Sequence, residues 1–289
     1  MRLSRKPAIE IKTPAQIALM REAGLVVARM LKAVACAAEP GISTAELDAI
    51  AEREMKAAGA ASSFKGYHGY PATICTSVND EIVHGIPSSQ VKLAAGDVLS
   101  IDAGAIVSGW HGDAAVTIGV GQISEPAAAL LRACERAMWR GLATAVAGRR
   151  LTDISHAVES SALSSEGYGV VREYTGHFIG SAMHMDPAVP NYGQPGRGPV
   201  LAEGMAMAIE PMLVLGNPDT RLLGDGWTVV TADGSLAAHF EHTVAITPEG
   251  PWVLTAEDGG RSGLAAATAA AADQAAQPGS DVTVGARRG

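Results

Sequence analysis

Two acidic residues stand close together in one apolar stretch of the chain. Asp102 lies near the end of one β-strand pattern and Asp113 near the start of the next, with a Gly-containing turn between them. If the strands pair as a hairpin, their alternation places both carboxylates on one polar face, opposite each other. Two carboxylates among apolar strands repel each other unless a cation compensates them. The pattern indicates a metal site, although an Asp beside Gly is also common at a simple turn.

A second copy of this pattern follows downstream. The segment Gly-Met-Ala-Met-Ala-Ile-Glu, which ends at Glu210, repeats the spacing of the segment that ends at Asp102, and Glu241 likewise echoes Asp113. Four carboxylates would then point inward from two related hairpins. They would carry a charge of about −4, which two divalent ions would neutralise. Because a water shared by such ions is acidic enough to act as hydroxide near neutral pH, the pattern indicates hydrolysis.

Histidines could complete such a site. His177, in Tyr-Thr-Gly-His-Phe-Ile-Gly, is the candidate nitrogen ligand, and its counterpart in the first half is His68, for which packing and a place in the site wall remain open. An imidazole shifts the preference of an oxygen site from magnesium or calcium toward manganese, iron, cobalt or zinc. We expect ordinary structural roles for His111, His156 and His239.

Helix patterns precede each hairpin and would position it. Thr13-Pro14 is a helix start, and Ser43 with Glu46 forms a capping-box pattern. Ser124 opens a third helix, and Thr152-Asp153 is expected to cap a fourth that ends at about residue 167. The order helix, helix, hairpin thus occurs twice.

The repeat predicts a catalytic domain over residues 13–255, after a short N-terminal segment of residues 1–12. Its halves, about 13–120 and 124–250, would be related by a pseudo-twofold axis, with their acidic faces meeting at a site between them. From about residue 256 to 289, Ala, Gly, Gln and Ser dominate. We expect a disordered tail there, in which the Ala-rich run could be partly helical.

Composition excludes several classes of protein. A chain of 289 residues with 47% hydrophobic residues can bury a substantial core. The net charge of −8 gives no excess of positive charge for specific nucleic-acid binding, although it does not exclude a local contact with the ribosome surface. Three cysteines without CxxC spacing fit a reducing compartment, and no apolar run reaches the length of a membrane span. We therefore expect a cytoplasmic protein that does not bind membranes.

Taken together, these residues resemble the type I methionine aminopeptidases, a family with the α+β pita-bread fold, in which helices cover the antiparallel sheet of two related halves. The resemblance extends over about residues 8–254. It rests on several short motifs in the order that the family has them: Gly66–Pro71, Asn79–Pro87, Ile101–Gly104, Gly112-Asp113, Gly176-His177, Ile209–Pro211, Gly226–Thr228 and Glu241–Thr243.

The resemblance implies a site with two divalent ions, which could be cobalt, manganese, iron or zinc. Asp102 would chelate one ion, His177 and Glu210 the other, and Asp113 and Glu241 would bridge the pair. A bridging water or hydroxide would attack the carbonyl of the first residue. In the family's scheme Glu210 also moves the proton, as general base and then acid.

The resemblance also implies a substrate. His84 and His184 match the family's two further catalytic histidines, which hydrogen-bond the peptide nitrogen and the scissile carbonyl or gem-diolate. The pocket for the methionine side chain would comprise Tyr67, Tyr70, Cys75, His84, Met183, His184 and Trp227. The expected activity is removal of the initiator methionine from nascent polypeptides when the second residue is small, by a monomeric enzyme.

The chain departs from the family pattern at three places, one of which is Val83, before His84, where many bacterial members have Cys; two alternatives stay open. Phe178 follows His177 where the family usually has Gly, so we expect its ring to crowd the substrate channel or to reorient the imidazole. Met183 and Met185 flank His184 where Phe and Glu are commoner. An X-Pro aminopeptidase or prolidase uses the same metal constellation, although the aromatic pocket argues against it. A pita-bread binding protein with weakened activity is the other alternative.

Overall fold

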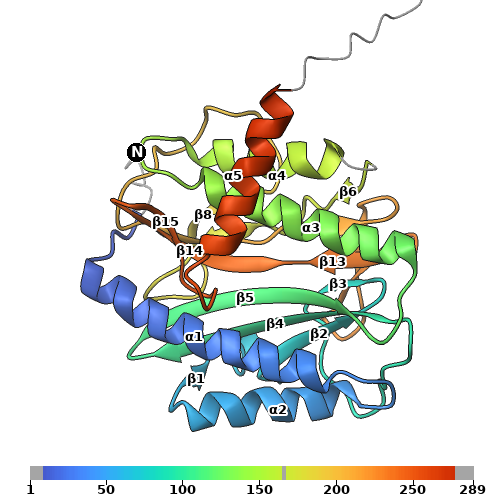
Figure 1. Cartoon of the computed structure of the whole chain (residues 1–289). Coiled ribbons are helices and arrows are strands. Elements are labelled where there is room, and N and C mark those ends of the chain that lie inside the picture. Colours follow the sequence, from blue (N-terminus) through green and yellow to red (C-terminus); the bar gives the residue numbers. More distant parts are fainter. Residues whose placement is uncertain (1–8, 165–166, 277–289) are drawn as a thin grey trace, which may run out of the picture.

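A curved antiparallel sheet of nine strands forms the centre of the molecule, and helices cover one of its faces (Figure 1). The computed structural model describes residues 9–164 and 167–276. The main path of the sheet runs β1-β4-β5-β14-β9-β7-β8, with β2 added beside β4 and β15 beside β14. These strands are β1 (Ala61–Ser62), β2 (Ile74–Val78), β4 (Val98–Val107), β5 (Trp110–Gly119), β7 (Gly176–Phe178), β8 (Met185–Val189), β9 (Ala206–Ile209), β14 (Glu241–Thr247) and β15 (Gly250–Val253).

Two small sheets flank the main one. One has the order β13-β10-β6 and the other β11-β12-β3. Four of their strands, β10 to β13, lie in the connection from β9 to β14, which explains the longer loop of the second hairpin. The flanking strands are β3 (Glu81–Val83), β6 (Gly169–Val170), β10 (Met212–Val214), β11 (Thr220–Leu222), β12 (Val229–Thr231) and β13 (Ala237–His239).

The predicted helices form close to their expected bounds. They are α1 (Pro14–Ala37), α2 (Thr44–Ala57), α3 (Glu125–Thr144) and α4 (Leu151–Ser164). Complete capping boxes begin α1 at Thr13 and α2 at Ser43, while the hydroxyl of Ser124 accepts from the third residue of α3. The expected cap of α4 is wrong by two residues. The helix begins at Leu151, so Thr152 already lies within it. The Asp153 carboxylate accepts a hydrogen bond from the backbone N–H of Arg150, the residue before the helix, at 2.8 Å.

The first hairpin differs from expectation in its register. Asp102 pairs with Ala115, and Asp113 pairs with Gly104. The two aspartates therefore share a face but lie diagonally, two residues apart in register, and do not stand directly opposite each other. The second hairpin has the predicted alternation, since Thr243 of β14 pairs with Ala208 of β9.

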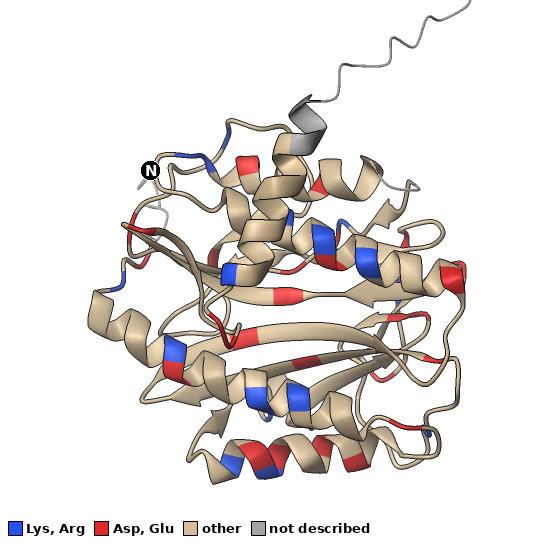
Figure 2. Cartoon of the chain, viewed as in Figure 1, with Lys and Arg blue, Asp and Glu red and all other residues tan. Residues whose placement is uncertain are grey.

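The halves meet edge to edge. β14 hydrogen-bonds to β5, with Glu241 opposite Ala115, so both hairpins belong to one sheet and the acidic strands are neighbours. The expectation of two separate faces turned toward each other is thus corrected. The Thr243 hydroxyl reinforces this seam, because it accepts from the N–H of Asp113 at 3.0 Å and donates to its C=O at 2.8 Å. Red bands on these central strands mark the acids in Figure 2.

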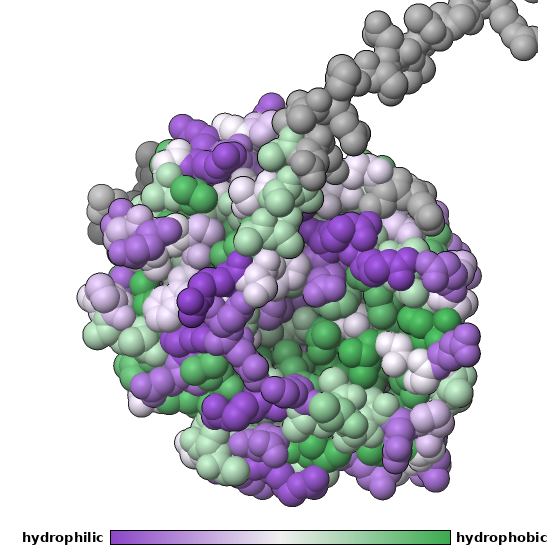
Figure 3. All heavy atoms as spheres, in the orientation of Figure 1, coloured by the Kyte–Doolittle hydropathy of each residue, from purple (hydrophilic) through white to green (hydrophobic). Residues whose placement is uncertain are grey.

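The apolar face of the sheet carries the core. Leu99 and Ile101 of β4 pack under α1 and α2, while Met207 and Ile209 of β9 pack under α3 and α4. Helix α1 closely approaches the segment that follows β15, because Gly24 has no side chain there. A Cβ on Gly24 would lie 2.3 Å from the carbonyl oxygen of Leu254. Figure 3 shows hydrophilic residues along the helices and green apolar residues in a recess between them.

The segment after residue 255 contains the helix that its Ala-rich run allows, and this helix extends beyond the run. Arg261–Ala276 forms α5, which packs against α3 and includes the Ala-rich run (Figure 1). The Arg140 guanidinium donates to the carbonyl of Ala267 at 3.0 Å, and Ala267 is buried. The rest of the tail, residues 277–289, lies outside the described residues. No helix in the described part of the chain is long and apolar enough to cross a membrane.

Candidate metal centre

All of the predicted site residues line a single cavity of about 170 Å³, together with Phe64. The cavity opens on the polar face of the sheet, where the acids lie on β4, β5 and β14 and directly after β9. A larger groove of about 880 Å³ lies beside α5, and its described lining includes neither histidine nor cysteine. The candidate metal ligands are therefore concentrated in the smaller cavity. They are Asp102, Asp113, His177, Glu210 and Glu241.

Burial makes the four carboxylates costly to ionise. It raises the pKa of Asp102 to about 7, although a hydrogen bond with Asp113 partly offsets the rise. Burial, followed by the charges of neighbouring acids, raises the pKa of Asp113, Glu210 and Glu241 well above the ordinary range. Groups of this kind ionise readily only when a cation stands among them.

His177 is oriented as a ligand. Its Nδ1 lies 3.1 Å from the carbonyl oxygen of Phe178, so Nδ1–H donates there and Nε2 carries the lone pair. Nε2 lies 3.4 Å from Oε1 of Glu210. Burial lowers the pKa of His177 to about 3, so the imidazole is neutral at physiological pH. A neutral imidazole with its second nitrogen fixed by a carbonyl is the form that binds metals.

Several buried polar atoms in this cluster have no hydrogen-bond partner among the described residues. They are Oδ1 of Asp102, Oδ1 of Asp113, Oε1 of Glu241 and Nε2 of His239. Unpartnered buried polar groups are rare because each costs about 1–3 kcal/mol. Ligand atoms of Asp113, His177 and Glu241 also lie within 4.8 Å of one another. The donor set of carboxylate oxygens and imidazole nitrogen therefore fits divalent manganese, iron, cobalt or zinc.

Two further histidines stand at the cavity wall. The ring of His184 lies 4.3 Å from that of His177, and its Nδ1 is 2.9 Å from the hydroxyl of Tyr67. His84 faces Trp227 edge to face, with the ring centres 6.5 Å apart. Burial lowers the pKa of His84 to about 4 and also lowers that of His184. Both rings are thus neutral, and each can donate one hydrogen bond to a substrate.

The backbone of His84 is unusual. Its φ is +61°, a left-handed conformation that residues with a side chain seldom adopt. Gly85 follows it in close contact with β2, where a Cβ would meet the carbonyl oxygen of Thr76 at 2.2 Å. Such strain persists only where the surrounding structure enforces it, and it concentrates at functional sites.

Apolar side chains form the remaining wall. Tyr70, Cys75 and Met183 belong to one small buried cluster, against which Tyr67 and Trp227 pack. The ring of Tyr70 lies 5.1 Å from that of Trp227, and its hydroxyl donates to the carbonyl oxygens of Ile74 and Gly85 at 3.1 and 3.0 Å. A rigid aromatic wall with sulfur neighbours suits a flexible thioether side chain.

Phe178 does not crowd the channel, so that expectation is wrong. Its side chain is 1% exposed and packs in the core under α3 and α4, on the opposite face of β7 from His177. Strand alternation forces this placement, because consecutive residues point to opposite faces. The influence of Phe178 on the site passes through its carbonyl, which accepts from His177.

Among the histidines expected to be ordinary, His239 belongs to the centre. It is 1% exposed, and its Nε2 lies 3.7 Å from Oε2 of Glu210 and 4.0 Å from Oε2 of Glu241. The alternation of the strand pattern, extended two residues upstream from Glu241, would have placed His239 on the same face as that acid. Three other histidines do not line the cavity. His156, on α4, and His68 are exposed. His111 lies 2.9 Å from the hydroxyl of Ser63.

Comparison with known proteins identifies the family of this chain. Residues 18–248 match the sequence model of metallopeptidase family M24. The chain belongs to metallopeptidase family M24. Methionine aminopeptidase 1 of Mycobacterium tuberculosis is 51% identical over 259 residues, which cover 88% of this chain and 97% of the relative. Methionine aminopeptidase 1 of Bacillus subtilis is 50% identical, covering 84% and 98% respectively. These matches place the chain among the methionine aminopeptidases of the M24 family.

Solved structures of M24 proteins share the fold. A crystal structure of methionine aminopeptidase from Thermotoga maritima has a TM-score of 0.85 at 42% identity, covering 86% of this chain and all of that one. Prolidase from Pyrococcus furiosus has a TM-score of 0.68 at 24% identity, covering 85% of this chain and 65% of that one. The second likeness shows a common pita-bread fold only, so the prolidase alternative has less support.

Proposed function

We propose that this chain is a metal-dependent aminopeptidase that removes the N-terminal methionine from nascent polypeptides, in the cytoplasm where they are made. One observation carries the proposal: a buried cluster of four carboxylates and an imidazole shares a single small cavity with an aromatic, sulfur-lined wall. The 50% identity to methionine aminopeptidases over most of the chain supports it. The cavity size suits one side chain, which favours an exopeptidase.

In this proposal the five ligands hold two divalent ions. The residues that would hold them are Asp102, Asp113, His177, Glu210 and Glu241. When bound, the ions would supply a water acidic enough to attack a carbonyl at neutral pH. The same cluster carries enough negative charge to attract the free α-ammonium group of a substrate.

The protein's own groups then guide the reaction. Glu210 would accept the proton of the attacking water and deliver it to the departing nitrogen, a role that suits a carboxylate whose pKa burial raises above the ordinary range. His84 and His184, both neutral, donate hydrogen bonds to the scissile peptide group and stabilise the charge that develops on its oxygen. Tyr67 holds His184 through the 2.9 Å contact between its hydroxyl and Nδ1.

The test uses protein stripped of metal and resupplied separately with manganese, iron, cobalt and zinc. Release of methionine is measured from Met-Ala and Met-Leu peptides and compared with cleavage of an X-Pro peptide. The proposal expects metal-dependent release from Met-Ala above Met-Leu, which Asp113→Asn abolishes. The matched control is Asp219→Asn, because Asp219 is exposed and outside the cavity. Cleavage of the X-Pro peptide alone would indicate a prolidase, and no cleavage with any ion would support a binding protein.

A further inference from the structure

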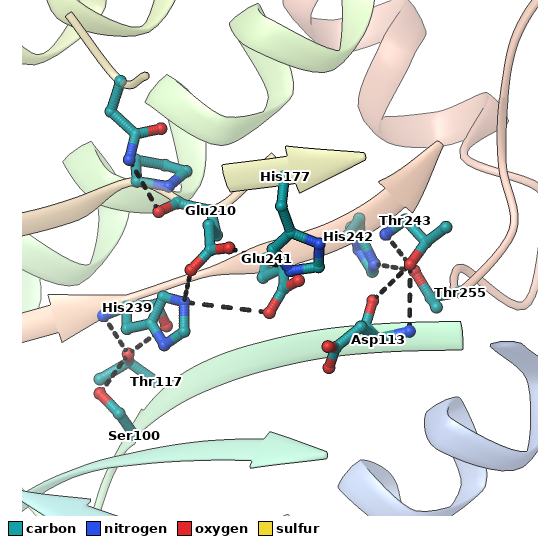
Figure 4. A network of polar contacts seen from close by, with 12 residues as sticks. Ser100, Asp113, Thr117, His177, Glu210, His239, Glu241, His242, Thr243 and Thr255 are labelled. Atoms are coloured by element: carbon teal, nitrogen blue, oxygen red, sulfur yellow. Dashed lines mark hydrogen bonds and ion pairs between the residues drawn. The ribbon is translucent and has the colours of Figure 1, made fainter. Parts of the chain in front are cut away.

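His239 stands among the acids without a role in the five-ligand set. Its imidazole, at the end of β13, lies between Glu210 and Glu241 (Figure 4). Nε2 is 3.7 Å from Oε2 of Glu210 and 4.0 Å from Oε2 of Glu241, and it has no hydrogen-bond partner among the described residues. A buried nitrogen that faces two buried carboxylates is a costly arrangement unless something satisfies all three groups.

The distances identify what would satisfy them. Hydrogen bonds between nitrogen and oxygen are about 2.7–3.2 Å long, so neither contact is one. Ligand atoms that each lie about 2.0–2.2 Å from a shared ion stand roughly 3–4 Å from one another. The three ligand atoms of Glu210, His239 and Glu241 lie within 4.8 Å of one another, a spacing that can close on one ion. We propose that these side chains hold a divalent cation, with Nε2 of His239 as a ligand.

The backbone holds His239 in place for this role. Its N–H donates to the Thr117 hydroxyl at 2.8 Å, and the same hydroxyl donates to its C=O at 2.6 Å. The Thr117 oxygen in turn lies 2.8 Å from the Ser100 hydroxyl on β4, so the end of β13 is tied to the first hairpin (Figure 4). A ligand fixed by such supporting contacts binds metal without having to be ordered first.

The inference rests on the proposed metal-dependent function and adds to it a second nitrogen ligand. Glu210 then has an imidazole beside each oxygen, since Oε1 faces His177 at 3.4 Å and Oε2 faces His239. Two imidazoles favour zinc, cobalt or iron over manganese more strongly than one does. The centre would therefore bind those ions more tightly than the five-ligand set alone.

The decisive measurement counts imidazole ligands. X-ray absorption of the full-length protein loaded with Co²⁺ distinguishes histidine ligands by the scattering of their rings. Wild type is expected to show two imidazoles per centre, and His239→Gln one. Co²⁺ titration, followed by calorimetry and by visible absorption, should show at least tenfold weaker binding of one ion in His239→Gln. The control is His111→Gln, a half-buried histidine outside the cavity, which should bind Co²⁺ like wild type.

The result can overturn the inference in two ways. One imidazole in wild type refutes it without any variant, so a His239→Gln protein that fails to fold does not leave the question open. Equal affinity and equal spectra of wild type and folded His239→Gln refute it as well. Release of methionine is assayed separately. Loss of that activity with every ion would refute the proposed function, while the imidazole count would still decide the ligand.

Discussion

Replacing Asp102 by Asn should stabilise the metal-free protein, the opposite of what most substitutions do. In the folded chain burial raises the pKa of Asp102 from 3.8 to about 7. The folded state therefore holds a proton that the unfolded state has released, and stability is lost as pH rises from about 4 through 7. The amide of the Asp102→Asn variant carries no charge at any pH, so the variant escapes this loss.

The size of the effect follows from the shift. Each pKa unit corresponds to about 1.4 kcal/mol, so a shift of about three units disfavours folding of wild type by roughly 4 kcal/mol at pH 8. At pH 5 the solution is only a little more than one unit above the unfolded-state pKa of Asp102, so the cost to wild type is roughly 1.7 kcal/mol. The advantage of Asp102→Asn should thus shrink by about 2.5 kcal/mol between pH 8 and pH 5. Removing this charge also eases ionisation of Glu210 and Glu241, which acts in the same direction.

Urea unfolding in the presence of a chelator measures these free energies at pH 5, 6, 7 and 8, with Asp219→Asn as control. Any packing difference between Asp and Asn is independent of pH. The change with pH in the difference between the two unfolding free energies therefore tests the raised pKa by itself. Adding metal should narrow the advantage of the variant at pH 8: at one hundred times the dissociation constant an ion stabilises wild type by about 2.7 kcal/mol, and Asp102→Asn by less. Parallel pH profiles of wild type and variant would refute the assignment of a raised pKa to Asp102.

Three further outcomes are expected. Co²⁺ affinity, measured by calorimetry, should fall about tenfold from pH 8 to pH 6, because Asp102 must lose its proton to bind; an affinity independent of pH would contradict this. His184→Asn should lower kcat for Met-Ala about a hundredfold while Co²⁺ binding is retained, and an equal loss in exposed His156→Asn would show that the effect is not local. Gly24→Ala should destabilise the fold by about 1–3 kcal/mol in urea, because its Cβ would overlap a carbonyl oxygen. Gly224→Ala, where a Cβ meets no atom within 4 Å, should not, and equal stability of the two variants would disprove the close contact.

The gathering of the four carboxylates in one cavity could be predicted because strand alternation and a repeated spacing are local properties of the chain. A carboxylate two residues from a small polar residue on the same strand shares its face whatever the rest of the fold does. The pairing register is not local in this way. The register depends on the turn between β4 and β5, where Ser108 and Gly109 both have positive φ. With this turn Asp102 and Asp113 become diagonal neighbours and not a directly opposed pair.

The interpretations that failed concern contacts between distant segments. Phe178 was expected to crowd the channel by its size, but the face it occupies is set by pairing of β7 with β8 and β9. The Ala-rich run that includes Ala267 was allowed a partly helical structure, but the helix extends beyond that run because α3 offers a surface to pack on. Composition describes what a segment would do alone, and tertiary packing overrides it.

The histidines show how far a duplicated chain can depart from symmetry. His68 and His177 occupy corresponding places in the two halves, yet only His177 lies in a paired strand, 8% exposed, beside the acids. His68 lies in a short 3₁₀ turn, Tyr67–Gly69, with a φ of +47°, and its ring packs against Tyr67 at the protein surface. A symmetric pair of imidazoles would have put one nitrogen on each side of the carboxylates. In this chain the buried nitrogens of His177 and His239 both come from the second half and flank Glu210, so that half would contribute both imidazoles of the proposed centre, while each half contributes two of its four carboxylates.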